Sequence, residues 1–441
     1  MELAQSRRTL LKHLGASAAV AGLTSPLLAA CGQSSAPESL ALTNQLDGAS
    51  LEVLLRGSFI PTFDELTLGL VGEWESQRDV TIDLQLSQVW REIVLDIARD
   101  RRGADMAAVH GNQPHVLSEQ LIDVSDLAES LGDALGGWAD VARATCVVDG
   151  VWRAVPWSTT RHALVVRTDL LDEVGATIPT TYEELLDAAI RLHDDGAPPV
   201  GITMSNEGPS DSSAIAYGML WSFGGQEVSS DGRVALDSSE TRAALRYFAE
   251  LSAVNVEGAL HFTHPDNNDA YLAEEISITQ NPSSILLKGL ELGLPFTDHI
   301  MHVALPEGPA GQFQLPEMNS LAIFDHSFEP IAAMDLIAFL NRREVLVDRA
   351  RESLAFHSPL VLGIDDDPEM PWRTDERLAG LSSTAAEGRM PGWPRPPSVE
   401  AGLVYLNNSI VKMFNGVGSG TMTVDEAVRS ATEELRVVYE T

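Results

Sequence analysis

Short apolar runs and amphipathic segments alternate along the first part of the chain. Residues 51–55 form an apolar run, residues 81–86 alternate between apolar and polar side chains, and residues 105–109 form a third run that ends at His110. Between these runs, residues 63–75 and 90–99 place apolar side chains at helical spacing. Strands that alternate with helices over short connections predict an α/β fold, with a parallel sheet covered by helices on both faces.

The N-terminal pattern is of another kind. Residues 6–12 (SRRTLLK) carry the paired arginines of a twin-arginine export signal, and residues 14–28 are too short and too rich in small residues to anchor a protein across a bilayer. Residues 28–32 (LAACG) resemble a lipobox, in which Cys31 is lipidated as the signal is removed. We expect a signal peptide over residues 1–30 and a tether over 31–47 that is rich in Ser, Ala and Pro. An ordinary secretory signal or a short N-terminal helix is the alternative.

The charge excludes some partners. The 441 residues include 64 Asp and Glu against 29 Lys and Arg, a formal net charge of −35. Phosphate binding needs a basic face, so the composition argues against a nucleic-acid partner. The carboxylates are spread along the chain and only three lysines occur, which favours a salt-adapted surface. That hypothesis predicts a melting temperature that rises with salt up to molar concentrations, and a flat profile would contradict it.

Cysteine adds little chemistry. Once Cys31 is lipidated, Cys146 is the one cysteine left in the sequence, so the chain has no internal disulfide. Cys146 lies in the apolar segment ATCVV, and we expect a buried small side chain there rather than a nucleophile.

The centre of the chain carries a family resemblance. Residues 148–157 (VDGVWRAVPW), 162–171 (HALVVRTDLL) and 174–185 (VGATIPTTYEEL) follow one another in the order found in family 1 extracellular solute-binding proteins. These are the carbohydrate receptors of ABC importers related to maltose-binding protein. Weaker matches keep the same order along the chain, at 224–232, 243–248, 276–282, 318–323, 330–341, 390–398 and 423–428. The resemblance covers residues 50 to 440 or so.

The resemblance implies a two-lobed α/β fold of the class II periplasmic-binding-protein type, with the ligand in a cleft between the lobes. The lobes would comprise residues 46–157 with 320–368, and residues 158–316 with 369–441, joined by crossings at 156–161 and 314–320. Together with the lipobox, it leads us to expect a monomeric lipid-anchored receptor that closes on a sugar-like solute and passes it to the membrane subunits of an ABC permease. A secreted hydrolase or lyase acting on polysaccharide is the alternative, and a receptor that serves chemotaxis or adhesion on the same fold is another.

Sugars present flat CH faces and a rim of hydroxyls, which proteins bind with aromatic rings and planar polar side chains. The candidates share a place at a strand end, a crossing or a loop that the family brings to the cleft: Ser58, His110, Asn112, Trp157, Arg161, Asn281, Asn319 and Trp393. A packed hinge residue is the alternative for Trp157, and a structural ion pair is the alternative for Arg161. Ser283 and Ser284 stand where the family often has an aromatic residue, which favours a small sugar or polyol over a maltodextrin.

Signals for metals and catalysis are weak. His261, His264 and Asp266 lie close together, but without helical spacing or a third nitrogen or sulfur ligand they are typical of a loop. The chain has no Gly-x-Ser-x-Gly, His-Glu-x-x-His or Walker sequence. We therefore expect a binding protein rather than an enzyme, with no cofactor and no metal.

Overall fold

The described residues form a five-stranded sheet, a three-stranded sheet and a small two-stranded sheet. The computed structural model describes residues 46, 48–58, 60–206, 211–263, 265–382 and 388–440. The predicted signal peptide, Cys31 and almost all of the tether lie outside the described residues, as does His264.

The first sheet has five strands in the order β2 (Val80–Ser87), β1 (Ala49–Arg56), β3 (Met106–His110), β10 (Glu317–Ile323) and β6 (Val155–Thr160). β1 runs parallel to β2 and β3, whereas β10 runs antiparallel to β3 and β6. The predicted strands and their parallel pairing are therefore confirmed, and the predicted helices are α2 (Pro61–Ser76) and α3 (Trp90–Asp100). The sheet is mixed because β10 enters it from the other half of the molecule.

The second sheet is smaller and antiparallel. Its order is β8 (Ile278–Asn281), β7 (Ala163–Arg167) and β9 (Ile300–Val303), with β7 paired to both neighbours. The helices of this half are α7 (Thr168–Glu173), α8 (Tyr182–Asp194), α9 (Asp211–Ser222), α10 (Ser239–Ser252), α11 (Asp266–Leu272), α12 (Ser284–Glu291), α18 (Ser409–Gly418) and α19 (Val424–Tyr439). Short 3-10 turns add η3 (Ala259–His261) and η4 (Pro295–His299).

Further elements cover the first sheet or link the two halves. They are α4 (Gln113–Val116), η2 (Ser118–Gln120), α5 (Ser125–Leu135), α6 (Asp140–Cys146), β4 (Val147–Val148), β5 (Val151–Trp152), α13 (Pro330–Leu340), α14 (Arg343–Glu352), α15 (Leu362–Asp365), α16 (Pro371–Thr374), η5 (Glu376–Leu381) and α17 (Val399–Leu406). η5 packs on β9, and α17 packs against α4 as well as α18 and α19.

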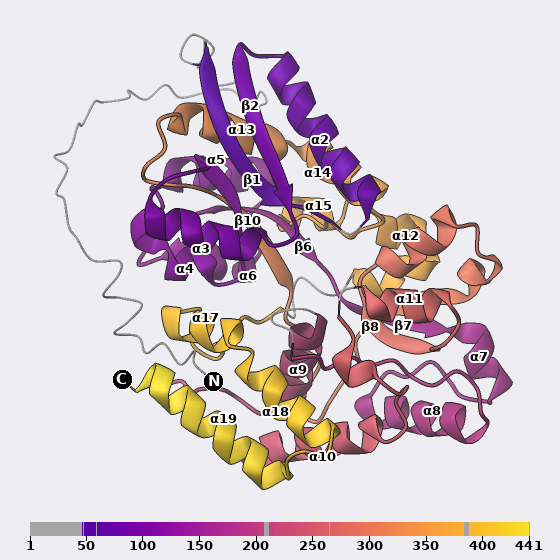
Figure 1. Cartoon of the computed structure of the whole chain (residues 1–441). Helices are drawn as coiled ribbons and strands as arrows, with labels where there is room; N and C mark the ends of the chain where they lie inside the picture. The colour runs from indigo at the N-terminus through magenta and orange to yellow at the C-terminus, as the bar shows by residue number, and fades with distance from the viewer. Residues whose placement is uncertain are drawn as a thin grey trace.

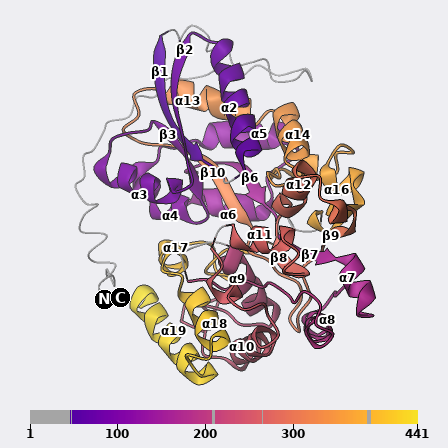
Figure 2. The ribbon, with the colours of Figure 1, turned by 45° about the vertical axis from the view of Figure 1, so that its right-hand side comes forward.

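The two halves form two lobes that are joined at their centre (Figure 1). β6 of the first sheet leads into β7 of the second with only Arg161 and His162 between them. The chain returns through residues 304–316 into β10, which pairs with β6. A view turned by 45° shows the same division, with α13, α2 and β1 at one end and α10, α18 and α19 at the other (Figure 2).

Each lobe has its own core. Trp74, Trp152 and Phe324 are buried around the first sheet, and Trp221 and Phe248 are buried in the second lobe. Cys146 is buried too, 3.1 Å from Ser320 Oγ, and burial raises the pKa of its thiol to about 12, so it is inert at neutral pH. Among the described residues, no helix is both long and apolar enough to cross a bilayer.

Candidate functional site

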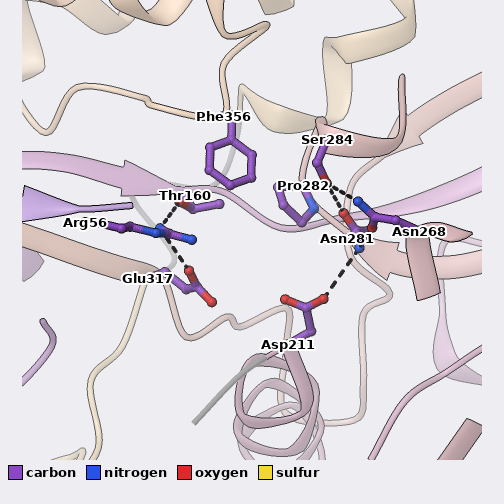
Figure 3. Close-up of a pocket in the computed structure, with 9 residues that line it drawn as sticks. All are labelled: Arg56, Thr160, Asp211, Asn268, Asn281, Pro282, Ser284, Glu317 and Phe356. Carbon is purple, nitrogen blue, oxygen red and sulfur yellow. Dashed lines mark hydrogen bonds and ion pairs between the residues drawn. The ribbon is translucent and has the colours of Figure 1, made fainter. Parts of the chain in front are cut away.

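A polar cavity lies where the two lobes meet, and Figure 3 shows the nine residues that line it. The first lobe and the crossing strands supply Arg56 at the end of β1, Thr160 at the end of β6, Glu317 at the start of β10, and Phe356 after α14. The second lobe supplies Asp211, Asn268, Asn281, Pro282 and Ser284. Ligands of open α/β sheets bind at the carboxyl ends of strands, and β1, β6 and β8 all end at this cavity.

Arg56 ties three strands together on one side of the cavity. Its Nη1 donates to Thr160 Oγ1 at 3.2 Å and lies 3.5 Å from Glu317 Oε2. The guanidinium also lies 5.4 Å from the ring centre of Phe356 and 5.4 Å from that of Trp90. Burial lowers the pKa of Arg56, while the charge of Glu317 opposes that effect. The side chain is thus held rigidly, with its charge facing the cavity.

An amide and hydroxyl network forms the opposite side. Asn281 Nδ2 donates to Asn268 Oδ1 at 2.8 Å, Ser284 Oγ donates to Asn281 Oδ1 at 2.7 Å, and Asn268 Nδ2 donates to Ser284 Oγ at 3.1 Å. Asn281 Nδ2 also approaches Asp211 Oδ2 at 3.5 Å, and Asn267 Nδ2 donates to the same oxygen at 2.9 Å. Side chains fixed in this way present donors and acceptors in a set geometry, as recognition of hydroxyl groups requires.

The cavity is closed in this conformation. The volume open to the centre of a water molecule is ≈ 10 Å³. That is about the space of one ordered water, and a sugar ring does not fit. The lobes, or the side chains between them, must move apart before a solute can enter.

Three buried groups meet beside the cavity and include atoms of the types that bind metals. One ligand atom from each of His162, Asp211 and Glu317 lies within 4.8 Å of the others. Burial would raise the pKa of Glu317, but His162 and the charge of Arg56 outweigh burial and hold it well below its usual range. Burial likewise lowers the pKa of His162, but the contact with Glu317 and the charge of Asp211 raise it overall. These charges favour a proton on His162 over a metal ion.

Of the eight predicted ligand-binding residues, Asn281 lines the cavity. His110 and Asn319 are paired across β3 and β10, and both are buried. His110 Nε2 lies 3.2 Å from the Tyr405 hydroxyl, and burial lowers the pKa of His110 to about 3. Asn112 is buried and its Nδ2 donates to the carbonyl of Pro391 at 3.4 Å, so it joins the first lobe to the C-terminal segment.

Trp157 and Arg161 lie in the first crossing and are almost fully buried. The guanidinium of Arg349 lies 3.8 Å from the ring centre of Trp157. Arg161 donates to Asp365 Oδ1 at 2.7 Å and to the carbonyl of Leu381 at 3.0 Å. Trp157 is thus a packed residue of the crossing and Arg161 forms a structural ion pair, as the alternatives for these two residues stated. Neither side chain lines the cavity in this conformation.

Ser58 and Trp393 lie apart from the cavity lining. Ser58 shapes the turn after β1: its backbone N–H donates to Asp64 Oδ1 at 2.8 Å, and its Oγ accepts from the N–H of Ile60 at 3.0 Å. Trp393 stacks on Phe313 with ring centres 6.4 Å apart, and the Arg389 guanidinium lies 3.5 Å from the centre of the Trp393 ring.

The prediction from sequence missed most of the cavity. Glu317 carried a usable signal, because it is a charged residue at the start of a strand in which every residue is buried. Arg56 carried another, because it follows the apolar run of a strand directly before Gly57 and Ser58. Asp211, Asn268 and Phe356 carried none, since they come from helices and a loop that only the tertiary fold brings together.

Comparison with known proteins agrees with this arrangement. Residues 61–280 match the family described as bacterial extracellular solute-binding protein. The chain is 29% identical over 150 residues to the putative ABC transporter periplasmic-binding protein YcjN of Escherichia coli strain K12; the match covers 32% of this chain and 34% of the relative.

Solved structures match over nearly the whole fold. Maltose-bound MalE3 of T. maritima superposes with a TM-score of 0.77 at 20% identity, covering 88% of this chain and 99% of that one. An ABC transporter solute-binding protein of Thermotoga lettingae TMO, solved with α-D-tagatose, gives a TM-score of 0.74 at 18% identity and covers 88% of this chain and 100% of that one.

Two α/β lobes joined by crossing strands around a polar cavity define the two-lobed periplasmic-binding-protein class. The chain belongs to the bacterial extracellular solute-binding protein family.

Proposed function

We propose that the protein captures a sugar or sugar-like solute between its lobes and delivers it to the membrane subunits of an ABC importer. The observation that carries this proposal is the cavity itself, because both lobes line it with amide, hydroxyl and charged side chains around one aromatic ring. A solute that contacts both lobes stabilises the closed state by its extra contacts there. The similarity to YcjN, a putative ABC transporter periplasmic-binding protein, and to maltose-bound MalE3 supports the same role.

We further propose that the mature chain is held at the outer face of the cytoplasmic membrane by lipid on Cys31, after twin-arginine export. The support is the sequence of residues 6–12 and 28–32. Cys31→Ser should release the protein from the membrane fraction. A variant that still sediments with membranes would argue against the anchor.

One observation could favour the hydrolase alternative: Asp211 and Glu317 form a pair of neighbouring carboxyl groups at the cavity. Glycoside hydrolysis needs one carboxyl with a raised pKa as general acid. The pKa of Glu317 is held well below its usual range, which is the opposite of that requirement. Glu317 therefore does not fit the role of the general acid.

Titration calorimetry of the purified protein against mono- and disaccharides, sugar acids, sugar phosphates and polyols tests the proposal. We expect saturable binding of at least one of them without turnover, and at least a tenfold loss of affinity in Asn281→Ala because that change breaks the network in the second lobe. The exposed Asn407→Ala is the matched control and should bind normally. Turnover of a saccharide, or an absence of binding across the whole set, would contradict the proposal.

A further inference from the structure

Arg349 is a buried cation to which the described residues offer no anionic partner. It lies on α14, its side chain is 5% exposed, and its guanidinium stacks on Trp157. No carboxylate of the described residues lies within 4 Å of it, and its Nε makes no hydrogen bond. The other two arginines that are as deeply buried are paired: Arg161 with Asp365 at 2.7 Å, and Arg167 with Asp169 at 2.7 Å. Arg349 is therefore the exception.

Burying Arg349 without such a partner lowers the free energy of unfolding. A buried charge without a partner loses its hydration and receives nothing equivalent in return. Stacking on Trp157 recovers part of that loss, since a cation over an indole ring is attracted to it. The sequence has 64 carboxylates and a net charge of −35, yet none of those described pairs with this arginine. The site is thus left positive in a strongly negative protein.

Arg349 is not one of the residues that line the cavity, but it is linked to two of them, Arg56 and Phe356. Burial and the charge of Arg56 lower the pKa of Arg349, and burial together with the charges of both arginines holds the pKa of His357 well below its usual range. His357 follows Phe356, which lines the cavity. The turn that ends α14 also meets the second lobe, because Ser283 Oγ lies 3.4 Å from the carbonyl of Ser353.

The carboxylates around this end of the cavity act on Arg56 and not on Arg349. Glu317, Asp211 and Asp64 oppose the fall in the pKa of Arg56, whereas the charge that acts on the pKa of Arg349 is the positive charge of Arg56. Glu317 lies 3.5 Å from Arg56, which leaves Arg349 as the charge without a neighbour of opposite sign. A solute that brings one anionic group would neutralise it as the lobes close.

We propose that the solute carries an anionic group, a carboxylate or a phosphate, which binds to Arg349 and Arg56 in the closed cleft. This inference rests on the proposed function, because it specifies the class of solute that the same cleft takes. Guanidinium groups suit it, since their planar fork matches both anions and stays charged at neutral pH.

Calorimetry with matched pairs of solutes tests the inference in the unmodified protein. The pairs are D-galactose with D-galacturonate, D-glucose with D-glucuronate, maltose with maltobionate, and D-glucose with glucose 6-phosphate. We expect at least one acid to bind ten times more tightly than its neutral partner, and the phosphate pair distinguishes phosphate from carboxylate. Neutral sugars that bind as tightly as their acids would overturn the inference but leave the proposed function standing. Binding of neither class would contradict both.

Variants at Arg349 locate the effect. Arg349→Gln should weaken binding of the acid by about 10- to 100-fold and of the neutral sugar by less than about threefold. Arg351→Gln, on the same helix but half exposed and paired with Asp348, should change neither. Arg349→Lys keeps the charge and should retain part of the preference for the acid over the neutral sugar. It is the variant to measure if Arg349→Gln does not fold. An Arg349 variant that folds and keeps the full preference for the acid would overturn the assignment.

Discussion

Glu227 shows how one residue ties the C-terminal segment to the second lobe. It is fully buried, accepts a hydrogen bond from the Tyr217 hydroxyl at 2.9 Å, and accepts another from the backbone N–H of Gly392 at 2.6 Å. Burial raises the pKa of its carboxyl to about 7, although both hydrogen bonds oppose that shift. The folded protein therefore holds a proton here at a pH where the unfolded chain has lost it.

The pH dependence of stability follows from this shift. Since the pKa of Glu227 is raised on folding, its protonated form supports the fold below pH 4.5, and that support is lost as the pH rises towards 7. Between these values, the free energy of unfolding of the wild type should fall relative to that of Glu227→Gln by about 1.4 kcal/mol per pH unit. Denaturant unfolding from pH 4 to pH 8 measures this difference. The exposed Glu250→Gln should run parallel to the wild type, and a parallel Glu227→Gln profile would refute the assignment.

Single residues also show where prediction from sequence stops. Asn319 was predicted and Glu317 was missed, although they lie two positions apart on β10. Strand alternation places the two side chains on the same face but does not tell which end of the strand borders the cavity. Arg349 gave no signal either, because a helix pattern predicts that a residue is buried but not that its charge lacks a partner.

At the scale of elements, local patterns were sufficient for prediction. The apolar runs gave β1, β2 and β3, and the helical spacing gave α2 and α3, nearly to their ends. Local chemistry explains some boundaries: α8 begins at a capping box in which Thr181 Oγ1 accepts from the N–H of Glu184. The antiparallel entry of β10 was not predictable in this way, since its partners β3 and β6 are distant in sequence.

Packing of η5 on β9 gives a prediction at this scale. A Cβ on Gly380 would collide with the backbone of His302 and Val303, which cannot move without disturbing β9. Gly380→Ala should therefore lower the free energy of unfolding by about 1 to 3 kcal/mol. Gly72 lies on the exposed side of α2 with nothing near its Cβ position, and Gly72→Ala should instead raise that energy by about 0.5 to 1 kcal/mol. Denaturant melts of both variants test the contrast, and a neutral Gly380→Ala would show that this contact is loose.

At the scale of the whole molecule, closure of the lobes would explain both the two-lobed fold and the small cavity between them. In the proposed function, the crossings at β6–β7 and at β10 are the hinges about which the lobes rotate, and the residues that line the cavity come from both sides of those crossings. Because the closed cavity has room for about one water, the protein must spend time in a more open form to receive a solute. The family resemblance implied this movement from the sequence alone, whereas the size of the closed cavity is known only from the structure.

Small-angle X-ray scattering, with and without a saturating solute found by calorimetry, tests the central claim most directly. We predict that the saturating solute lowers the radius of gyration of the ligand-free protein, because it draws the two lobes together around itself. Lysozyme measured in the same buffers controls for effects of the solute on scattering contrast. A radius of gyration that the saturating solute leaves unchanged would contradict capture by closure of the lobes.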